Sequence, residues 1–275
     1  MEKITVKDIL ALKNKRKITM LTAYDYPLAS LEDKAGIDMI LVGDSLANVV
    51  LGLDSTTKVG MSEMLHHAKA VTRAVKRALV VGDMPYESYQ VHPDEAVKNA
   101  KRFIDEASCD VVKLEWFDKC LEVTEKIIKA GIPVMGHIGL TPQTADKLGG
   151  LKVQGKDAET AKRLIEQAQA LEKLGCFSIV LECVPDKISR IITEKLKIPT
   201  IGIGAGPDCD GQVLVAHDML GLFDRYTPKF VKKYVNLSTL ISKAVEEYIN
   251  EVTQGKFPAA QHCFTIKEEE LRKLK

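Results

Sequence analysis

The sequence has neither an excess of one charge nor a long hydrophobic run. Its 275 residues contain 39 Lys and Arg against 38 Asp and Glu, a formal net charge of +1. Without a basic excess to neutralise phosphates, the chain is not expected to bind nucleic acid. No apolar run approaches the roughly 18–20 residues that span a bilayer, and the first residues contain no signal-peptide core. We therefore expect a soluble, cytoplasmic protein with no membrane partner.

The cysteines form no pattern, and no stretch has the composition of a linker. Six Cys residues are scattered without a C-x-x-C pair or a repeated spacing with His, which argues against a zinc ribbon and a disulfide framework. We expect free thiols, most of them buried. Because no segment is rich enough in Pro, Gly or Ser to separate domains, we expect residues 1–275 to form a single catalytic domain.

Short apolar, β-branched runs recur along the chain, and each is followed by a turn and a segment with helical periodicity. This alternation is typical of βα units that build a parallel sheet covered by helices. The expected strands are 18–23, 39–42, 79–81, 111–114, 133–135, 178–181, 200–203 and 213–216. Eight such units in a chain of this length favour a (β/α)8 TIM barrel, and an open doubly wound sheet is the alternative. Val, Ile and Leu can fill a barrel interior, so an aromatic content of only 5% is compatible with it.

Helices are expected around the barrel and at both ends of the chain. Residues 92–108 form one candidate, with Pro93 near its start, and residues 158–174 form another that ends at Gly175. Residues 6–13 are expected to form an N-terminal helix that plugs the bottom of the barrel. Residues 229–253 are expected to add C-terminal helices after the last strand, followed by a charged, solvated helix end.

Polar side chains follow the apolar runs, at the point where each expected strand ends. These residues are Tyr24, Asp25, Asp44, Ser45, Asp83, Lys113, Glu115, His137, Glu182, His217 and Asp218. In a (β/α)8 barrel the strand ends meet at the C-terminal mouth, where such enzymes carry out their chemistry. Any single acidic residue here has a simpler explanation as a helix cap. Several carboxylates converging with a Lys and a His are harder to explain in that way.

Converging carboxylates would repel one another and raise one another's pKa values, so they favour a hard divalent cation. Oxygen ligands, without cysteine or paired histidine at zinc spacing, favour Mg²⁺ or Mn²⁺ over Zn²⁺. Asp44 and Asp83 each follow a Gly and are the candidate direct ligands; helix capping is the alternative. A metal held in this way can chelate a 2-oxo acid and stabilise an enolate, and Glu182 is the candidate base that removes the proton.

Two further motifs are discounted. Gly202–Pro207 resembles a dinucleotide-binding fingerprint, but Pro207 stands where a third Gly or Ala belongs and no helical pattern begins there. We expect a loop that passes close to a ligand or to backbone. His66 and His67 lie within a helical pattern, where neighbouring residues face different directions, so a joint metal site is not expected.

At these residues the sequence resembles the ketopantoate hydroxymethyltransferases. The resemblance runs from about Thr5 to Phe264 and is carried by long blocks in order, which are more specific than any short motif. The blocks are 22–25, 42–45, 82–90, 112–115, 135–143, 152–156, 181–185 and 198–215. Two departures are visible: Trp116-Phe117 stands where the family pattern has Gly-Gly, and Gln261 stands where it has an acidic residue.

The resemblance implies a (β/α)8 barrel of the phosphoenolpyruvate-utilising type, with Mg²⁺ held by Asp44 and Asp83 and with Glu115 close by, partly through water. It also implies that Ser45 and Lys113 bind the 2-oxo acid. The family transfers a one-carbon unit from 5,10-methylenetetrahydrofolate to 3-methyl-2-oxobutanoate, giving 2-dehydropantoate and tetrahydrofolate in pantothenate biosynthesis. Its members are cytoplasmic and commonly form decamers built from two pentameric rings, so a homo-oligomer is expected.

The residues and the resemblance together predict a mechanism. The oxo acid chelates Mg²⁺, Glu182 removes the C3 proton, and the Mg²⁺-bound enolate attacks the methylene carbon of the folate. Lys113 offsets negative charge on the oxo acid, and His137 donates a hydrogen bond near the new hydroxymethyl group. A Schiff-base role for Lys113 is the alternative. Two other functions stay open, namely a lyase or mutase of Mg²⁺-bound oxo acids that needs no folate, and a barrel that only binds a ligand.

Overall fold

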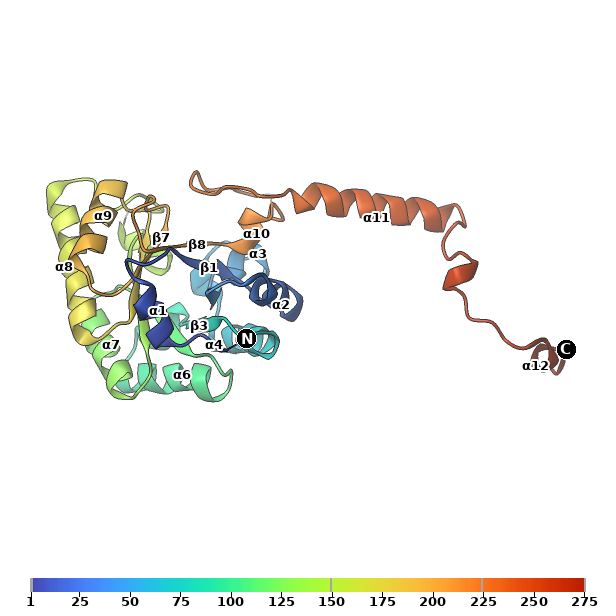
Figure 1. Ribbon diagram of the computed structural model, residues 1–275, viewed down its shortest axis with the longest axis horizontal. Helices are drawn as coiled ribbons and strands as arrows, with labels where there is room; N and C mark the ends of the chain where they lie inside the picture. The colour runs from blue at the N-terminus through green and yellow to red at the C-terminus, as the bar shows by residue number, and fades with distance from the viewer. Residues whose placement is uncertain (1, 149, 224, 275) are drawn as a thin grey trace.

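The computed structural model describes residues 2–148, 150–223 and 225–274. Eight parallel strands close into a barrel in chain order, β1 beside β2 and so on until β8 pairs with β1 (Figure 1). The strands are β1 (Ile18–Thr22), β2 (Met39–Val42), β3 (Leu79–Asp83), β4 (Val111–Glu115), β5 (Val134–Gly139), β6 (Ser178–Glu182), β7 (Thr200–Ile203) and β8 (Gly211–Leu214). The prediction of a (β/α)8 barrel over an open sheet is therefore confirmed.

Alternate residues of each strand fill the interior of the barrel. Val81, Val111 and Met135 belong to one buried cluster inside the strands, whereas Val80 and Val112 belong to a second cluster under the outer helices. Because side chains alternate between the two faces of a strand, a residue two positions beyond an inward one also points inward. The interior therefore continues upward from β3 and β4 into Asp83 and Lys113, which are fully buried.

The bottom of the barrel is closed by α1 (Val6–Leu12), as predicted. Thr5 caps this helix in a capping box with Asp8. Ile9 is fully buried and packs into the interior cluster, and Ile4 and Leu12 pack against the same cluster. Solvent is thereby excluded from the end of the barrel opposite the polar strand ends.

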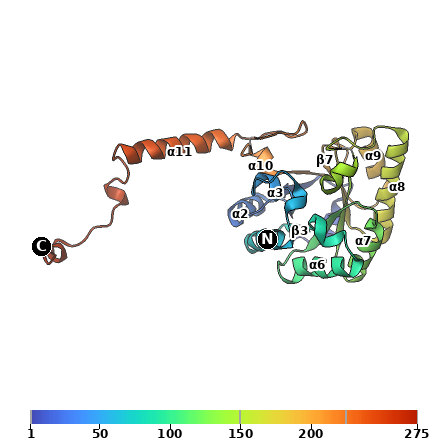
Figure 2. The same cartoon turned by 180° about the vertical axis from the view of Figure 1, so that it is seen from behind.

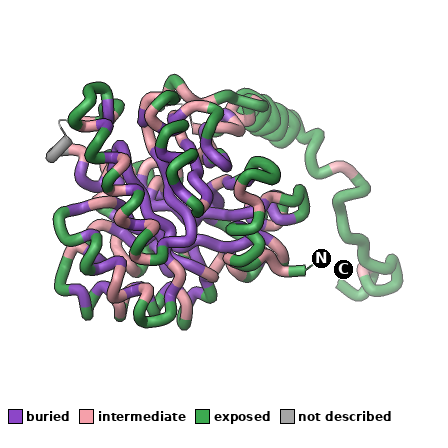
Figure 3. Tube along the Cα trace, turned by 60° about the vertical axis from the view of Figure 1, so that its left-hand side comes forward, coloured by how far each residue is buried: buried purple, intermediate pink, exposed green. Residues whose placement is uncertain are grey.

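Helices cover the outside of the barrel from β1 to β7. The long ones are α2 (Tyr26–Ala35), α4 (Met61–Ala74), α6 (Pro93–Asp105), α7 (Cys120–Lys129), α8 (Ala158–Leu174) and α9 (Asp186–Lys195). Helix α8 has the predicted bounds, and α6 is shorter than predicted at both ends. Short helical turns lie in the loops that follow the strands: α3 (Leu46–Val49), η1 (Thr56–Lys58), α5 (Tyr86–Tyr89) and η2 (Pro142–Leu148). Figure 3 shows the buried strands enclosed by this partly exposed shell.

The last βα units depart from the predicted pattern. Residues 204–210, all of them described, connect β7 to β8 without a helix. Strand β8 begins at Gly211, two residues before the prediction, and Gly211 pairs with Ile18 so closely that a Cβ there would lie 2.6 Å from the Ile18 carbonyl oxygen. His217 and Asp218 consequently lie on α10 (Ala216–Met219) and not at a strand end.

The C-terminal segment extends away from the barrel (Figures 1 and 2). Its elements are α11 (Leu237–Thr253), η3 (Ala260–His262) and α12 (Glu268–Arg272), so the predicted helical region 229–253 is helical only from Leu237. None of these three elements has a buried residue. The C-terminal helices thus exist as expected, but they do not pack on their own barrel.

The structure also confirms the predictions for the cysteines and for the loop after β7. The cysteines are free, and Cys109, Cys120, Cys176 and Cys209 are buried. The loop after β7 does pass close to other chain segments: Gly206 has φ +81°, and a Cβ there would lie 2.6 Å from the Asp186 Cβ. No helix in the described parts of the chain is long and apolar enough to span a membrane.

Asp33, at the C-terminal end of α2, holds the entry to β3 and generates a prediction. Its carboxylate accepts hydrogen bonds from the backbone N–H groups of Lys76, Arg77 and Ala78 at 2.9, 3.1 and 2.7 Å. Burial raises the pKa of Asp33, but these hydrogen bonds outweigh burial and lower it below 3.8. In Asp33→Asn one acceptor becomes a donor, so the free energy of unfolding should fall by about 1–3 kcal/mol at pH 7.

This stabilisation is present above the unfolded-state pKa and is lost as the pH falls through the lower folded-state pKa. The difference between wild type and Asp33→Asn, measured by urea unfolding, should therefore narrow below about pH 4. Asp105→Asn, a change at an exposed residue of α6, is the matched control and should have no such effect. Equal stability of Asp33→Asn and wild type at pH 7 would contradict the assignment.

Candidate active site

Five polar residues face inward at the C-terminal ends of four adjacent strands. They are Asp83 of β3, Lys113 and Glu115 of β4, His137 of β5 and Glu182 of β6. Strand register places Asp83 beside Lys113 and Glu115 beside His137. Each lies an even number of residues beyond an interior apolar residue such as Val81, Val111, Met135 or Val180, so the pleat turns all of them to the same side. The structure thus brings together the residues that the sequence placed at one mouth.

The five side chains are linked by short polar contacts. Lys113 Nζ lies 2.6 Å from Asp83 Oδ1 and 3.5 Å from His137 Nδ1. His137 then contacts two carboxylates, with Nδ1 3.5 Å from Glu115 Oε1 and Nε2 3.2 Å from Glu182 Oε2. A continuous ionic cluster, defined here as these five residues, therefore crosses from β3 to β6.

Lys113 and His137, the two basic residues of the ionic cluster, are protonated. Burial and the Lys113 charge lower the pKa of His137, but the carboxylates of Glu115 and Glu182 outweigh them and raise it to about 9. Burial also lowers the pKa of Lys113, and the negative charges of Asp83, Glu115 and Asp44 outweigh it and raise that pKa. With raised pKa values both residues are cationic at neutral pH, and each can donate hydrogen bonds.

Burial destabilises the charged form of two carboxylates in the cluster, Asp83 and Glu115, and so raises their pKa values. Burial, together with the charges of Asp44 and Glu115, raises the pKa of Asp83 to about 7, although Lys113 opposes the shift. Burial likewise raises the pKa of Glu115, against the effect of His137. With Asp44 included, four carboxylates face two cations, a formal charge of −2. This imbalance favours the binding of a further positive charge.

Asp44 and Ser45 complete the mouth at the end of β2. The Asp44 N–H donates to Asp83 Oδ2 at 3.1 Å, which joins the two candidate metal ligands directly. Ser45 Oγ lies 2.8 Å from the Tyr24 hydroxyl. A Cβ at Gly43 would lie 2.9 Å from Ser45 Oγ, so the turn before Asp44 leaves little room for a side chain.

Gln143 contacts the site, but the sequence patterns did not predict it as a site residue. Its backbone N–H donates to Glu115 Oε2 at 3.0 Å, and its side-chain Nε2 donates to Asp44 Oδ2 at 2.9 Å. Its Oε1 accepts a hydrogen bond from the buried Tyr89 hydroxyl. Gln143 lies in η2, beyond the end of β5, so no strand pattern points to it. The only signal was its place in the block 135–143 of the family resemblance.

The donor set fits a magnesium ion at Asp44 and Asp83. Asp83 Oδ1 is buried and has no hydrogen bond of regular geometry, although Lys113 Nζ lies close to it. Both oxygens of Glu115 already face His137 and Gln143. Among the described residues, no group of three His, Cys, Asp or Glu is arranged to hold a metal. Mg²⁺ commonly takes only one or two protein carboxylates and fills its shell with water and substrate oxygens.

Other residues at the expected strand ends have different roles. Asp25 caps α2, with Oδ1 accepting from the Leu28 N–H at 2.8 Å, which is the simpler explanation considered above. His217 packs against the Tyr24 ring, with centroids 5.3 Å apart. Burial raises the pKa of Asp218 to about 6. None of the three makes a described polar contact with the ionic cluster.

Fold and site together define a (β/α)8-barrel enzyme with a charged, buried centre at its C-terminal mouth. A model of the ketopantoate hydroxymethyltransferase family matches residues 3–260. The chain belongs to this family. The predicted resemblance and the prediction that the chain is a hydroxymethyltransferase enzyme are both confirmed.

Individual relatives support this assignment. The 3-methyl-2-oxobutanoate hydroxymethyltransferase of Syntrophomonas wolfei subsp. wolfei is 60% identical over 262 residues, which cover 95% of each chain. The enzyme of the same name from Syntrophobacter fumaroxidans is 57% identical over 99% of this chain and 96% of its own.

Solved structures show the same fold at low sequence identity. The 2,3-dimethylmalate lyase structure, described as a PEP mutase/isocitrate lyase superfamily member, has a TM-score of 0.60 at 13% identity over 98% of both chains. Phosphonopyruvate hydrolase, crystallised with oxalate and Mg²⁺, has a TM-score of 0.60 at 14% identity over 98% of both chains. These structures thus share the (β/α)8-barrel fold of this chain.

Proposed function

We propose that the chain transfers a one-carbon unit from 5,10-methylenetetrahydrofolate to 3-methyl-2-oxobutanoate, giving 2-dehydropantoate and tetrahydrofolate. In this reaction the C3–H bond of the oxo acid breaks and a bond forms between C3 and the methylene carbon. Both methylene C–N bonds of the donor break. One water supplies the hydroxyl oxygen, and its remaining proton and the C3 proton end on the folate nitrogens.

The observation that best supports this proposal is the graded exposure of the ionic cluster. The side chains of Lys113, Asp83, Glu115 and His137 are each at most 5% exposed, whereas that of Glu182 is 17% exposed. Glu182 is therefore the carboxylate of the cluster that a substrate in the mouth can reach. His137 Nε2 at 3.2 Å orients it. A carboxylate with this placement suits a general base for the C3 proton.

We further propose that Asp44 and Asp83 hold Mg²⁺ and that Glu115 contributes through water. When bound, Mg²⁺ supplies positive charge that stabilises an enolate of the oxo acid. The net negative cluster and the Asp44–Asp83 contact support this assignment. The fold relative crystallised with oxalate, itself a small dicarboxylate, and Mg²⁺ is consistent with it.

Lys113 and Ser45 are proposed to bind the 2-oxo acid. Lys113 remains protonated beside Asp83, so it can offset the negative charge of the oxo acid and is poorly suited to Schiff-base formation. His137, also protonated, can donate a hydrogen bond toward the new hydroxymethyl group. The buried surroundings strengthen both interactions, because few waters compete with them.

The C-terminal segment supports the expectation of a homo-oligomer. Six apolar residues of α11 lie on one face of the helix and are 43–57% exposed: Leu240, Ile241, Val245, Tyr248, Ile249 and Val252. A projecting helix does not normally leave such a face in water. We propose that residues 1–275 form one catalytic barrel domain whose α11 packs against further copies in a cytoplasmic homo-oligomer, a decamer in line with the family resemblance.

The proposed reaction is tested by its requirements. Formation of 2-dehydropantoate by the purified protein should require both a divalent metal and methylenetetrahydrofolate, and chelation by EDTA should abolish it until Mg²⁺ is restored. Product analysis by mass spectrometry distinguishes this reaction from that of a lyase or mutase. Cleavage or rearrangement of the oxo acid without folate would contradict the proposal.

The base is tested by solvent exchange. Glu182→Gln should lower the rate of C3 deuterium incorporation from D2O into 3-methyl-2-oxobutanoate at least about 100-fold, because the amide cannot accept the proton. Affinity for the oxo acid should stay nearly unchanged. Glu122→Gln, at an exposed residue of α7, is the matched control. Exchange at the wild-type rate in Glu182→Gln would remove Glu182 as the base.

The oligomer is tested on α11. Val245→Glu/Ile249→Glu puts two negative charges on the apolar face and should reduce the particle mass measured by light scattering. Lys243→Gln/Asn250→Glu changes the net charge equally on the opposite face of the same helix and should leave the mass unchanged. An unchanged mass in the first variant, or a monomeric wild type, would contradict the proposed role of α11.

A further inference from the structure

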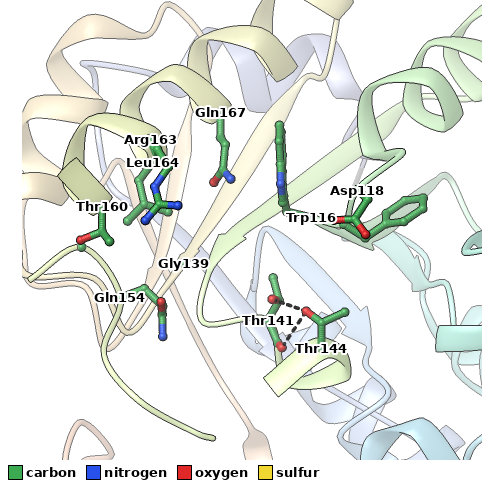
Figure 4. Close-up of a pocket in the computed structure, with 12 residues that line it drawn as sticks. Trp116, Asp118, Gly139, Thr141, Thr144, Gln154, Thr160, Arg163, Leu164 and Gln167 are labelled. Atoms are coloured by element: carbon green, nitrogen blue, oxygen red, sulfur yellow. Dashed lines mark hydrogen bonds between the residues drawn. The ribbon is translucent and has the colours of Figure 1, made fainter. Parts of the chain in front are cut away.

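A cavity lies next to the ionic cluster and is lined by residues that neighbour the cluster in the chain or in the sheet. It has a volume of about 220 Å³ and is formed by the segments that follow β4 and β5 together with the first half of α8 (Figure 4). Trp116 follows Glu115 directly, and its backbone N–H donates to the His137 carbonyl at 2.9 Å. Gly139, on the other wall, pairs with Glu182 in the sheet. A molecule in this cavity would therefore lie beside the ends of the strands that carry Glu115 and Glu182.

The chemistry of this cavity differs from that of the ionic cluster. Trp116 is half-buried and Phe117 is buried, so one side of the cavity is aromatic. Figure 4 shows Arg163 and Gln167 of α8 pointing into the same space, across from Trp116. Arg163 is exposed and makes no ion pair with any other residue that the structure describes. The cavity thus combines a flat apolar wall, the Gln167 amide, the Asp118 carboxylate and a guanidinium group that has no ion pair among the described residues.

These features match a flat heteroaromatic molecule with an anionic tail. Ring systems stack on Trp, and a guanidinium group binds carboxylates through paired hydrogen bonds. The volume is below the roughly 300–1,000 Å³ of pockets that enclose a whole drug-sized ligand. A bicyclic ring would therefore fit inside, with its tail leading out past Arg163.

We propose that this cavity binds the one-carbon donor, with the pterin ring against Trp116 and the glutamate carboxylates toward Arg163. The inference rests on the proposed function and adds the donor site to it. The 2-oxo acid occupies the ionic side of the mouth and the donor occupies the aromatic side. Trp116 and Gly139 lie at the boundary between the two sides, as the chain neighbour of Glu115 and the sheet neighbour of Glu182, so the methylene carbon would have to reach the oxo acid across this boundary.

The proposal is tested by binding, independently of turnover. Calorimetry should show tetrahydrofolate binding about tenfold more weakly to Arg163→Gln than to wild type, because a charge-assisted contact is lost. Lys162→Gln, at the neighbouring exposed residue of α8, is the matched control and should bind normally. Tetrahydropteroate lacks the glutamate carboxylates, so its affinity should be insensitive to Arg163→Gln. Trp116→Ala should weaken binding of both ligands.

A direct signal is also available, because Trp116 is the only tryptophan of the chain. Tetrahydrofolate should change its fluorescence, whereas 3-methyl-2-oxobutanoate binding to the variants should match wild type and show that they are folded. Unchanged tetrahydrofolate affinity in Trp116→Ala and Arg163→Gln would overturn the proposal. An equal loss with tetrahydropteroate in Arg163→Gln would overturn the role of Arg163. Failure of the reaction itself would be distinct, since wild type would then bind tetrahydrofolate but form no product.

Discussion

The contact between Lys113 and Asp83 is the constraint on which the mouth of the barrel depends. Two charged groups lie 2.6 Å apart with side chains at most 5% exposed, in surroundings where an unpaired charge would be strongly unfavourable. Lys113 also lies near His137, whose two nitrogens face Glu115 and Glu182. Replacing this layer with apolar residues could give an equally stable barrel. Its presence is better explained by chemistry than by stability, since its net negative charge is matched to cationic and polar ligands.

The position of this layer follows from the pleat of the strands, which is why the sequence predicted it well. Val111, Lys113 and Glu115 alternate with Val112 and Leu114, and the same period of two applies in β3, β5 and β6. Parallel strands in a closed barrel bring equivalent ends together regardless of their distance in the chain. Local patterns therefore determined which residues would meet, although β3 to β6 extend further than their apolar runs and include the functional residues themselves.

The features that the sequence did not predict depend on contacts without a local period. Gln143 reaches Asp44 and Glu115 from a loop after β5, and a polar residue in a loop has many possible partners. Strand β8 starts at Gly211, where it pairs closely with Ile18, and neither Gly211 nor Gln212 belongs to the apolar run from which the strand was predicted. Helix α11 was expected from its periodicity, but periodicity does not say on what an apolar face packs. The sequence therefore predicted the features set by local periodicity, and it did not predict those set by contacts between residues far apart in the chain.

The two halves of the mouth differ in a way that suits the two substrates of the proposed reaction. An oxo acid that must lose a proton needs fixed charge and little water, and the ionic cluster is buried accordingly. The proposed donor is large and must enter and leave, and recognition by stacking and by an exposed guanidinium group tolerates solvent. Helix α8 and the end of β4 provide that open side, while β3 to β6 provide the closed one. Because Trp116 immediately follows Glu115, the end of β4 contributes one residue to the ionic cluster and the next residue to the proposed donor cavity.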